Sequence, residues 1–309
     1  MRIVFMGTPD FSVPVLEGLI ENYNVVGVVS QPDKEVGRKR VLTPTPTKEV
    51  AIKNNIPVIQ PIKIRKEYQE VLDLKPDLIV TCAYGQIIPK EILDCPKLGC
   101  INVHGSLLPK LRGGAPIHHA IIDGYDETGI TIMYMDEAMD SGDIISQRSI
   151  KIEDSDNVGI LWDKMSLLGR DLLLETLPSI IDGTNDRIKQ DESLVTFGLN
   201  IKREEEHIDF NKTSREVFNQ IRGLNPWPSA NAILDGNEMK IYSSIIGDRA
   251  FSNKSNGEIC DITKKGISVK TGDGEIILTD IKPFGKKRMD AYSYVNGVGK
   301  DNLIGKVFK

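Results

Sequence analysis

The sequence predicts an α/β protein in two parts, a Rossmann-like and mostly parallel sheet followed by a small C-terminal OB-like β-barrel. Up to about residue 150, short apolar runs alternate with helical patterns, as in consecutive βαβ units. Near the C-terminus, about five short strand patterns lie close together and are separated by turn signals such as Asp235-Gly236. At 309 residues the chain is also long enough for two domains.

The elements of the N-terminal part follow from this alternation. Strands are expected where apolar, β-branched residues dominate, and helices where apolar residues recur at helical spacing. The expected strands are 2–6, 24–30, 58–59, 77–81, 99–104, 129–135 and 143–152. The expected helices are 10–21, 49–54, 66–72, 115–123 and 157–181.

The long helix over 157–181 ends at Asp182-Gly183-Thr184-Asn185, and the next residues are polar and irregular. We therefore expect a first domain over 1–183, a linker over 184–206 and a second domain over 207–309. In the second domain we expect one helix followed by the strands of the barrel. Their ranges are 217–222 for the helix and 232–234, 239–246, 257–262, 266–270 and 275–281 for the strands.

The charge is unevenly distributed along the chain. The net charge is −5, yet residues 207–309 hold 16 Lys and Arg against 12 Asp and Glu. A mildly basic part on an acidic protein suits a polyanionic partner. An uneven surface without any partner explains the counts equally well.

Composition argues against several other classes. No apolar run reaches the roughly 18 residues of a membrane span, and the N-terminus begins a strand at once. The four cysteines form no C-x-x-C pair, which indicates a reduced, cytoplasmic compartment. With four histidines and no ligand-spaced cluster, we expect no metal.

The most informative segment is 101–116, which places Asn102 and His104 at the end of a predicted strand. Residues i and i+2 of a strand point to the same side, so an amide and an imidazole converge there. An amide donor beside a titratable imidazole can stabilise an oxyanion and move a proton, as acyl transfer to an amine requires. Downstream, Asp140 and Asp143 are both candidates to pair with His104, and spacing alone does not choose between them.

Two further loops bear on function. Gly7-Thr8-Pro9-Asp10-Phe11 has one glycine where a dinucleotide fold has several, which disfavours a nicotinamide or flavin cofactor. The long loop 31–48 is basic, and such a cluster suits phosphate contact, although a solvated loop is the plain alternative. Its candidate contacts are Lys34, Arg38, Lys39 and Arg40. The run 286–288 near the C-terminus allows the same two interpretations.

Several motifs resemble those of the methionyl-tRNA formyltransferases, a branch of the folate-dependent formyltransferase family, along essentially the whole chain. The central one, Asn-Val-His-Gly-Ser-Leu-Leu-Pro at 102–109, is shared by the wider family. The others are Gly-Thr-Pro-Asp-Phe at 7–11, Gln-Pro-Asp at 31–33, Gly-Arg at 37–38, Ala-Tyr-Gly at 83–85, Arg-Gly-Gly-Ala-Pro at 112–116, Met-Asp-Ser-Gly-Asp at 139–143, Asn-Pro-Trp-Pro at 225–228 and Thr-Gly-Asp-Gly at 271–274.

The resemblance implies a catalytic trio of Asn102, His104 and Asp140. It also implies that 10-formyltetrahydrofolate is the formyl donor and that methionyl initiator tRNA is the acceptor, for translation initiation. The segment implied to bind the folate is Ser106, Leu107, Leu108 and Pro109. The loop around Arg38 matches the one that enters the tRNA acceptor end, and the barrel matches the domain that holds the tRNA. His118 differs from the family pattern, in which an amide is more usual.

These expectations describe a cytoplasmic enzyme that acts as a monomer without a metal. Two rival functions remain. One is a folate-dependent formyltransferase acting on a sugar-nucleotide or ribotide amine, which would leave the basic loop and the C-terminal part unexplained. The other is a non-catalytic RNA-binding protein on the same scaffold, which would not need an intact trio.

Overall fold

The computed structural model describes residues 1–37 and 39–309, which form two compact units. Unit 1 comprises Met1–Pro116, Glu127–Lys151 and Trp162–Leu199. Unit 2 comprises Ile117–Asp126, Ile152–Leu161 and Asn200–Lys309. Two short segments that precede Asn200 therefore fold with the C-terminal part.

A seven-stranded sheet forms the centre of unit 1, in the order β5-β2-β1-β6-β7-β8-β9. The pairs from β5 to β7 are parallel, whereas β7–β8 and β8–β9 are antiparallel. The predicted mostly parallel sheet is thus confirmed. The strands are β1 (Ile3–Gly7), β2 (Val25–Val29), β5 (Val58–Ile59), β6 (Leu78–Cys82), β7 (Cys100–His104), β8 (Glu127–Tyr134) and β9 (Ile144–Lys151).

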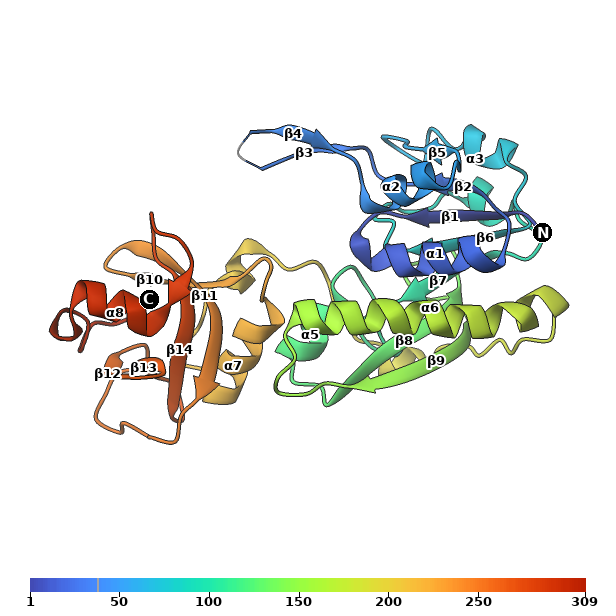
Figure 1. Cartoon of the computed structure of the whole chain (residues 1–309). Helices are drawn as coiled ribbons and strands as arrows, with labels where there is room; N and C mark the ends of the chain where they lie inside the picture. The colour runs from blue at the N-terminus through green and yellow to red at the C-terminus, as the bar shows by residue number, and fades with distance from the viewer. Residues whose placement is uncertain (38) are drawn as a thin grey trace. The chain divides into compact units, whose positions relative to one another are not determined.

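Helices cover both faces of this sheet (Figure 1). On one face, α3 (Gln69–Asp73) and α4 (Lys90–Leu93) pack on alternate residues of β1 such as Val4 and Met6. On the other face lie α1 (Val13–Asn22), preceded by η1 (Asp10–Ser12), and the part of α6 (Val158–Asp182) in unit 1. There, Gly169 lies so close to Val103 and Ile130 that an added Cβ would come within 3.0 Å of Val103.

The prediction of a loop over 31–48 is wrong in one respect, because this segment contains a β-hairpin. Strands β3 (Lys34–Val36) and β4 (Val41–Thr43) pair antiparallel, and the hairpin projects from the rest of unit 1 (Figure 1). Helix α2 (Pro46–Lys53) begins three residues earlier than predicted, since the Thr45 hydroxyl accepts a hydrogen bond from the Lys48 N–H.

Unit 2 contains the predicted antiparallel barrel, with six strands rather than five, in the order β10-β11-β14-β13-β12 with β15 on β14. Main-chain hydrogen bonds join residues 305–309 to Gly257 and Ile259 on one side and to Ile233 on the other. This segment connects β10 to β12 and closes the sheet. The strands are β10 (Ala230–Leu234), β11 (Asn237–Ile246), β12 (Ile259–Thr263), β13 (Gly266–Lys270), β14 (Glu275–Lys282) and β15 (Met289–Asp290).

Two helices pack on the barrel. Helix α7 (Ser214–Gly223) begins with a capping box, in which Thr213 and Glu216 bond to each other's main-chain N–H groups. Helix α8 (Ala291–Val298), absent from the prediction, is capped by Asp290. Short helices η2 (Glu192–Leu194), η3 (Arg203–Glu206) and η4 (Lys300–Asn302) lie in the connections, and α5 (Pro116–Ile122) spans the division between the two units.

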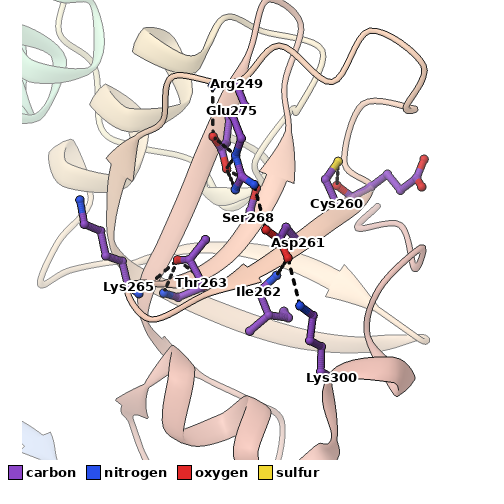
Figure 2. A network of polar contacts seen from close by, with 11 residues as sticks. Arg249, Cys260, Asp261, Ile262, Thr263, Lys265, Ser268, Glu275 and Lys300 are labelled. Atoms are coloured by element: carbon purple, nitrogen blue, oxygen red, sulfur yellow. Dashed lines mark hydrogen bonds and ion pairs between the residues drawn. The ribbon is translucent and has the colours of Figure 1, made fainter.

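An ion network ties the loop after β11 to the barrel (Figure 2). The side chain of Glu275 is only 1% exposed and accepts hydrogen bonds from Arg249 and Ser268. Arg249 also reaches Asp261 at 2.8 Å, and Lys300 approaches the same carboxylate at 3.3 Å. Burial favours a raised pKa for Glu275, but the bonds from Arg249 and Ser268 outweigh it and lower the pKa below its ordinary value.

Candidate active site

Strand β7 delivers the predicted pair to the carboxyl edge of the sheet in unit 1. Asn102 pairs in register with Thr81 of β6 and Met133 of β8, and His104 lies opposite Thr131. In open α/β sheets, ligands bind beyond the carboxyl ends of the parallel strands. The predicted i, i+2 geometry therefore places both side chains at the edge where a substrate would be expected.

The orientation of the Asn102 amide is set by a neighbouring hydroxyl. Thr81 Oγ1 donates to Asn102 Oδ1 at 2.8 Å. The described residues offer the amide nitrogen no hydrogen-bond partner, and the side chain is half-buried. Its N–H groups can therefore donate to a ligand oxygen.

His104 is 6% exposed and meets a different group at each ring nitrogen. Nε2 lies 3.2 Å from the Leu111 carbonyl oxygen, so Nε2 carries a hydrogen and donates it. Nδ1 lies 3.8 Å from Asp140 Oδ1. That separation suits an ion pair and is longer than a hydrogen bond; catalytic hydrogen bonds are often long without substrate.

The structure places Asp140, not Asp143, beside His104. Asp140 adopts a left-handed conformation, with φ of 50°, and its Oδ2 accepts a hydrogen bond from the Gly113 N–H at 2.8 Å. Asp143 instead accepts from Arg187 Nε at 3.0 Å. Asn102, His104 and Asp140 thus come together from a strand and a turn that lie far apart in the sequence.

The segment 106–109 forms a turn directly after His104. Ser106 and Leu108 are buried, and the Ser106 hydroxyl donates to the Lys110 carbonyl at 2.6 Å. The Thr131 hydroxyl accepts from the Leu108 N–H at 3.1 Å. Leu107 and Pro109 are half-buried. Their side chains can therefore touch a ligand, whereas Ser106 and Leu108 chiefly shape the turn.

Three of the four predicted basic contacts lie on the projecting hairpin. Lys34, Lys39 and Arg40 are exposed, and the guanidinium of Arg40 approaches Glu35 at 3.5 Å. Arg38, the remaining predicted contact, lies outside the described residues. In unit 2, Arg288 pairs with Asp280 at 2.6 Å and covers the Tyr242 ring, while Lys286 lies over Tyr294.

Sequence reasoning missed the residues that support the site. Thr81 could have been found, since the expected strand 77–81 ends beside the strand of Asn102. Gln190 and Thr196 carried no local signal, because their partners lie far from them in the sequence. Gln190 Nε2 donates to the main chain of the 140–142 turn, and Thr196 bonds to the loop that begins at Leu111.

No group of three or more metal-ligating side chains occurs within residues 1–37 and 39–309. In the same residues, no helix combines the length and the apolar character needed to cross a membrane.

An amide donor, an imidazole and a carboxylate at the carboxyl edge of a sheet are typical of an enzyme that transfers an acyl group.

Comparison with known proteins specifies the class further. Residues 1–177 match the formyl transferase family, and residues 200–299 match the formyl transferase C-terminal domain. The chain belongs to the formyl transferase family. A curated methionyl-tRNA formyltransferase of Staphylococcus aureus (strain MW2) is 55% identical to it, over 99% of this chain and 98% of that relative.

Solved structures share the fold at lower identity. An N-formyltransferase from Helicobacter canadensis, in complex with folinic acid and dTDP-3-aminofucose, superposes with a TM-score of 0.69 at 22% identity, over 92% of this chain and 100% of that one. HypX from Aquifex aeolicus, in complex with tetrahydrofolic acid, gives a TM-score of 0.64 at 18% identity, over 96% of this chain. The chain spans only 47% of HypX.

Proposed function

We propose that this chain transfers the formyl group of 10-formyltetrahydrofolate to the α-amino group of methionine on initiator tRNA, in the cytoplasm and as a monomer. The observation that carries the proposal is the convergence of Asn102, His104 and Asp140 in a chain that matches methionyl-tRNA formyltransferase relatives almost end to end. An intact trio disfavours a non-catalytic RNA-binding role.

The carboxyl edge of unit 1 offers surfaces that fit a folate. Ile87 is 63% exposed and Met139 is 51% exposed, although both are apolar. Ile87 lies just before α4 and Met139 lies in the loop after β8, and Lys90 of α4 forms an ion pair with Glu137 of that loop at 3.2 Å. Flat aromatic ligands bind between apolar side chains with a few polar groups to orient them. These two residues, with Leu107 and Pro109, would hold the donor, which supplies the formyl group.

The roles of the trio follow from its geometry. As the amine attacks the formyl carbon, negative charge develops on the formyl oxygen, and the Asn102 N–H groups would donate to it. The bond between the formyl carbon and the folate nitrogen then breaks, and His104 would assist in moving the proton from the attacking nitrogen to that departing nitrogen. Asp140 would orient the imidazole and balance its charge when it is protonated. Holding the reacting atoms together supplies a large part of the acceleration.

Basic residues in both units would bind the tRNA. Lys34, Arg38, Lys39 and Arg40 would meet the acceptor end. The barrel, in a part of the chain with four more basic than acidic residues, would hold the body of the tRNA. Phosphate contacts of this kind release counterions, so affinity should fall steeply as salt is raised.

The test is incorporation of labelled formyl from 10-formyltetrahydrofolate into methionyl initiator tRNA. Free methionine, uncharged initiator tRNA and an amino-sugar nucleotide serve as competing acceptors. Formylation confined to the charged tRNA would support the proposal. Transfer to the amino-sugar nucleotide alone would overturn the acceptor and keep the chemistry, and no transfer to any acceptor would overturn the function.

A further inference from the structure

The segment 188–198 lies against both loops that face His104. We infer that it acts as a clamp that sets the position of the His104 imidazole, and that Gln190 is its principal positioning residue. This inference rests on the proposed function, because it assigns residues to the same catalytic site. The clamp, as defined here, is residues 188–198, all of them in unit 1.

The C-terminal part of the clamp holds the loop 111–115. The Leu111 N–H donates to Thr196 Oγ1 and the Arg112 N–H to the Thr196 carbonyl, each at 2.9 Å. Gly198 exchanges further main-chain bonds with Arg112 and Ala115, each at 2.8 Å. An added Cβ on Gly113 would lie 2.8 Å from the Gly198 carbonyl oxygen, so the two backbones approach as closely as glycine allows.

The N-terminal part of the clamp holds the turn that carries Asp140. Ile188 and Ile144 exchange two main-chain hydrogen bonds, at 2.8 and 2.9 Å. Gln190 Nε2 donates to the carbonyl oxygens of Asp140 and Gly142, both at 2.8 Å. Asp140 lies in the left-handed region, where non-glycine residues are uncommon, and these bonds to its turn support it there.

A buried arginine fixes which way the Gln190 amide faces. Arg112 Nε and Nη2 donate to Gln190 Oε1 at 3.0 and 2.8 Å, and the guanidinium also reaches Glu192 at 2.8 Å. Because arginine only donates, the oxygen of the amide must face it, which turns the NH₂ group toward the 140–142 turn. One glutamine side chain therefore couples Arg112 to the main chain of Asp140.

Both groups that face His104 sit on clamped loops. The Leu111 carbonyl, which accepts from Nε2, belongs to the first loop, and the Asp140 carboxylate beside Nδ1 belongs to the second. The Gly113 N–H on Asp140 Oδ2 also links the two loops directly. A shift of the clamp would therefore move both the Leu111 carbonyl and the Asp140 carboxylate, and with them the His104 imidazole. Misplacement of a catalytic group by about 1 Å can lower the rate about 100-fold.

The experiment replaces Gln190 with Glu and with Leu in the full chain. Gln190→Glu keeps an acceptor for Arg112 but replaces the NH₂ donor with a carboxylate oxygen, which repels the carbonyl oxygens of Asp140 and Gly142. Gln190→Leu removes every hydrogen bond of this side chain. Gln220→Leu is the matched control, since Gln220 Nε2 likewise donates to two carbonyls, of Glu205 and His207, but in unit 2. The readouts are the NMR resonances of ¹⁵N-labelled histidine, with His104 assigned by substitution, and kcat and KM for formyl transfer.

We expect both Gln190 variants to shift the His104 resonances and to lower kcat by about 10- to 100-fold with little change in KM for the folate. Gln220→Leu should leave the His104 resonances in place. Unshifted His104 resonances in a folded Gln190→Glu protein, with wild-type kcat, would overturn the inference and leave the proposed function standing. Shifted resonances in a chain whose wild type transfers no formyl group would retain the clamp and reject the proposed function.

Discussion

His104 in unit 1 and His118 in unit 2 are buried to almost the same degree, at 6% and 7% exposure, but their surroundings differ. Each ring nitrogen of His104 faces an oxygen, one from the Leu111 carbonyl and one from Asp140. His118 packs against the Trp227 ring, 6.1 Å between centroids, and its Nδ1 has no partner among the described residues.

The difference shows that burial alone does not make a histidine useful for catalysis. Burial lowers the pKa of His118 to about 4, even though a bond to the main chain of Trp227 favours the charged form. Such a group is neutral at physiological pH and can neither donate nor accept a proton there on demand. His104 has a carboxylate within ion-pair distance, and His118 has none among the residues that the structure describes.

The largest expected effect on kcat comes from removing His104, and removing His118 is the comparison. His104→Ala should lower kcat by about 10³-fold, since general acid–base groups typically contribute 10²–10⁴-fold. His118→Gln should retain the wild-type kcat. Both variants are assayed for formyl transfer, and tRNA affinity is measured by filter binding. Equal losses of kcat in the two variants would break the comparison.

The next largest effect is on stability, and it comes from a buried charge that loses its partner. Arg249→Met leaves the Glu275 carboxylate buried without its cation, and we expect a loss of about 3 kcal/mol in the free energy of unfolding. This is the lower end for buried pairs, because the guanidinium keeps some contact with water. Urea denaturation measures the loss. The double variant with Glu275→Gln should recover part of it, and a double variant as unstable as Arg249→Met would contradict the explanation.

His118 should make stability depend on pH. Its pKa is about 4 in the folded protein and about 6.5 when unfolded, so below pH 6.5 the unfolded chain binds a proton that the folded chain does not. Stability should fall by roughly 2.5 kcal/mol between pH 7.5 and 4.5 from this group alone. Urea midpoints of wild type and His118→Gln at both pH values isolate the effect. An identical pH dependence in the two proteins would exclude it.

The smallest effect concerns the support of Asn102. Thr81→Val removes the hydroxyl that donates to Asn102 Oδ1 but keeps the shape of the side chain. One net hydrogen bond is worth about 1 kcal/mol, so kcat should fall by about fivefold. Thr176→Val, which removes a similarly buried hydroxyl of α6, is the control. If both variants match wild type, Thr81 does not orient the amide.

Local sequence patterns predicted most of the fold and half of the geometry of the candidate site. Alternation located the central strands, and the i, i+2 rule placed Asn102 and His104 on one side of β7. Residue spacing could not show which of Asp140 and Asp143 lies beside His104. The left-handed conformation of Asp140 turns the chain at that position, and spacing does not report such a turn. Thr196 and Gln190 pair with loops about 50 to 85 positions away, and local periodicity does not report pairs so distant in sequence.

Two elements were missed for different reasons. The strands of the β3–β4 hairpin are three residues long and exposed, so they lack the buried alternation by which strands are recognised. Helix α8 is rich in Tyr and Val, which favour strands over helices. Its Asp290 cap was the available signal.

The closure of the barrel by residues 305–309 has a consequence for biosynthesis. The residues that pair with Ile233 and Ile259 follow all the strands of unit 2 in the sequence, so they are translated after those strands. Unit 1 has its full set of strands once Lys151 has left the ribosome, whereas the edges of β10 and β12 lack these partners until residues 305–309 have emerged. Exposed edges recruit other chains, so the interval before closure is when the nascent protein most needs a chaperone.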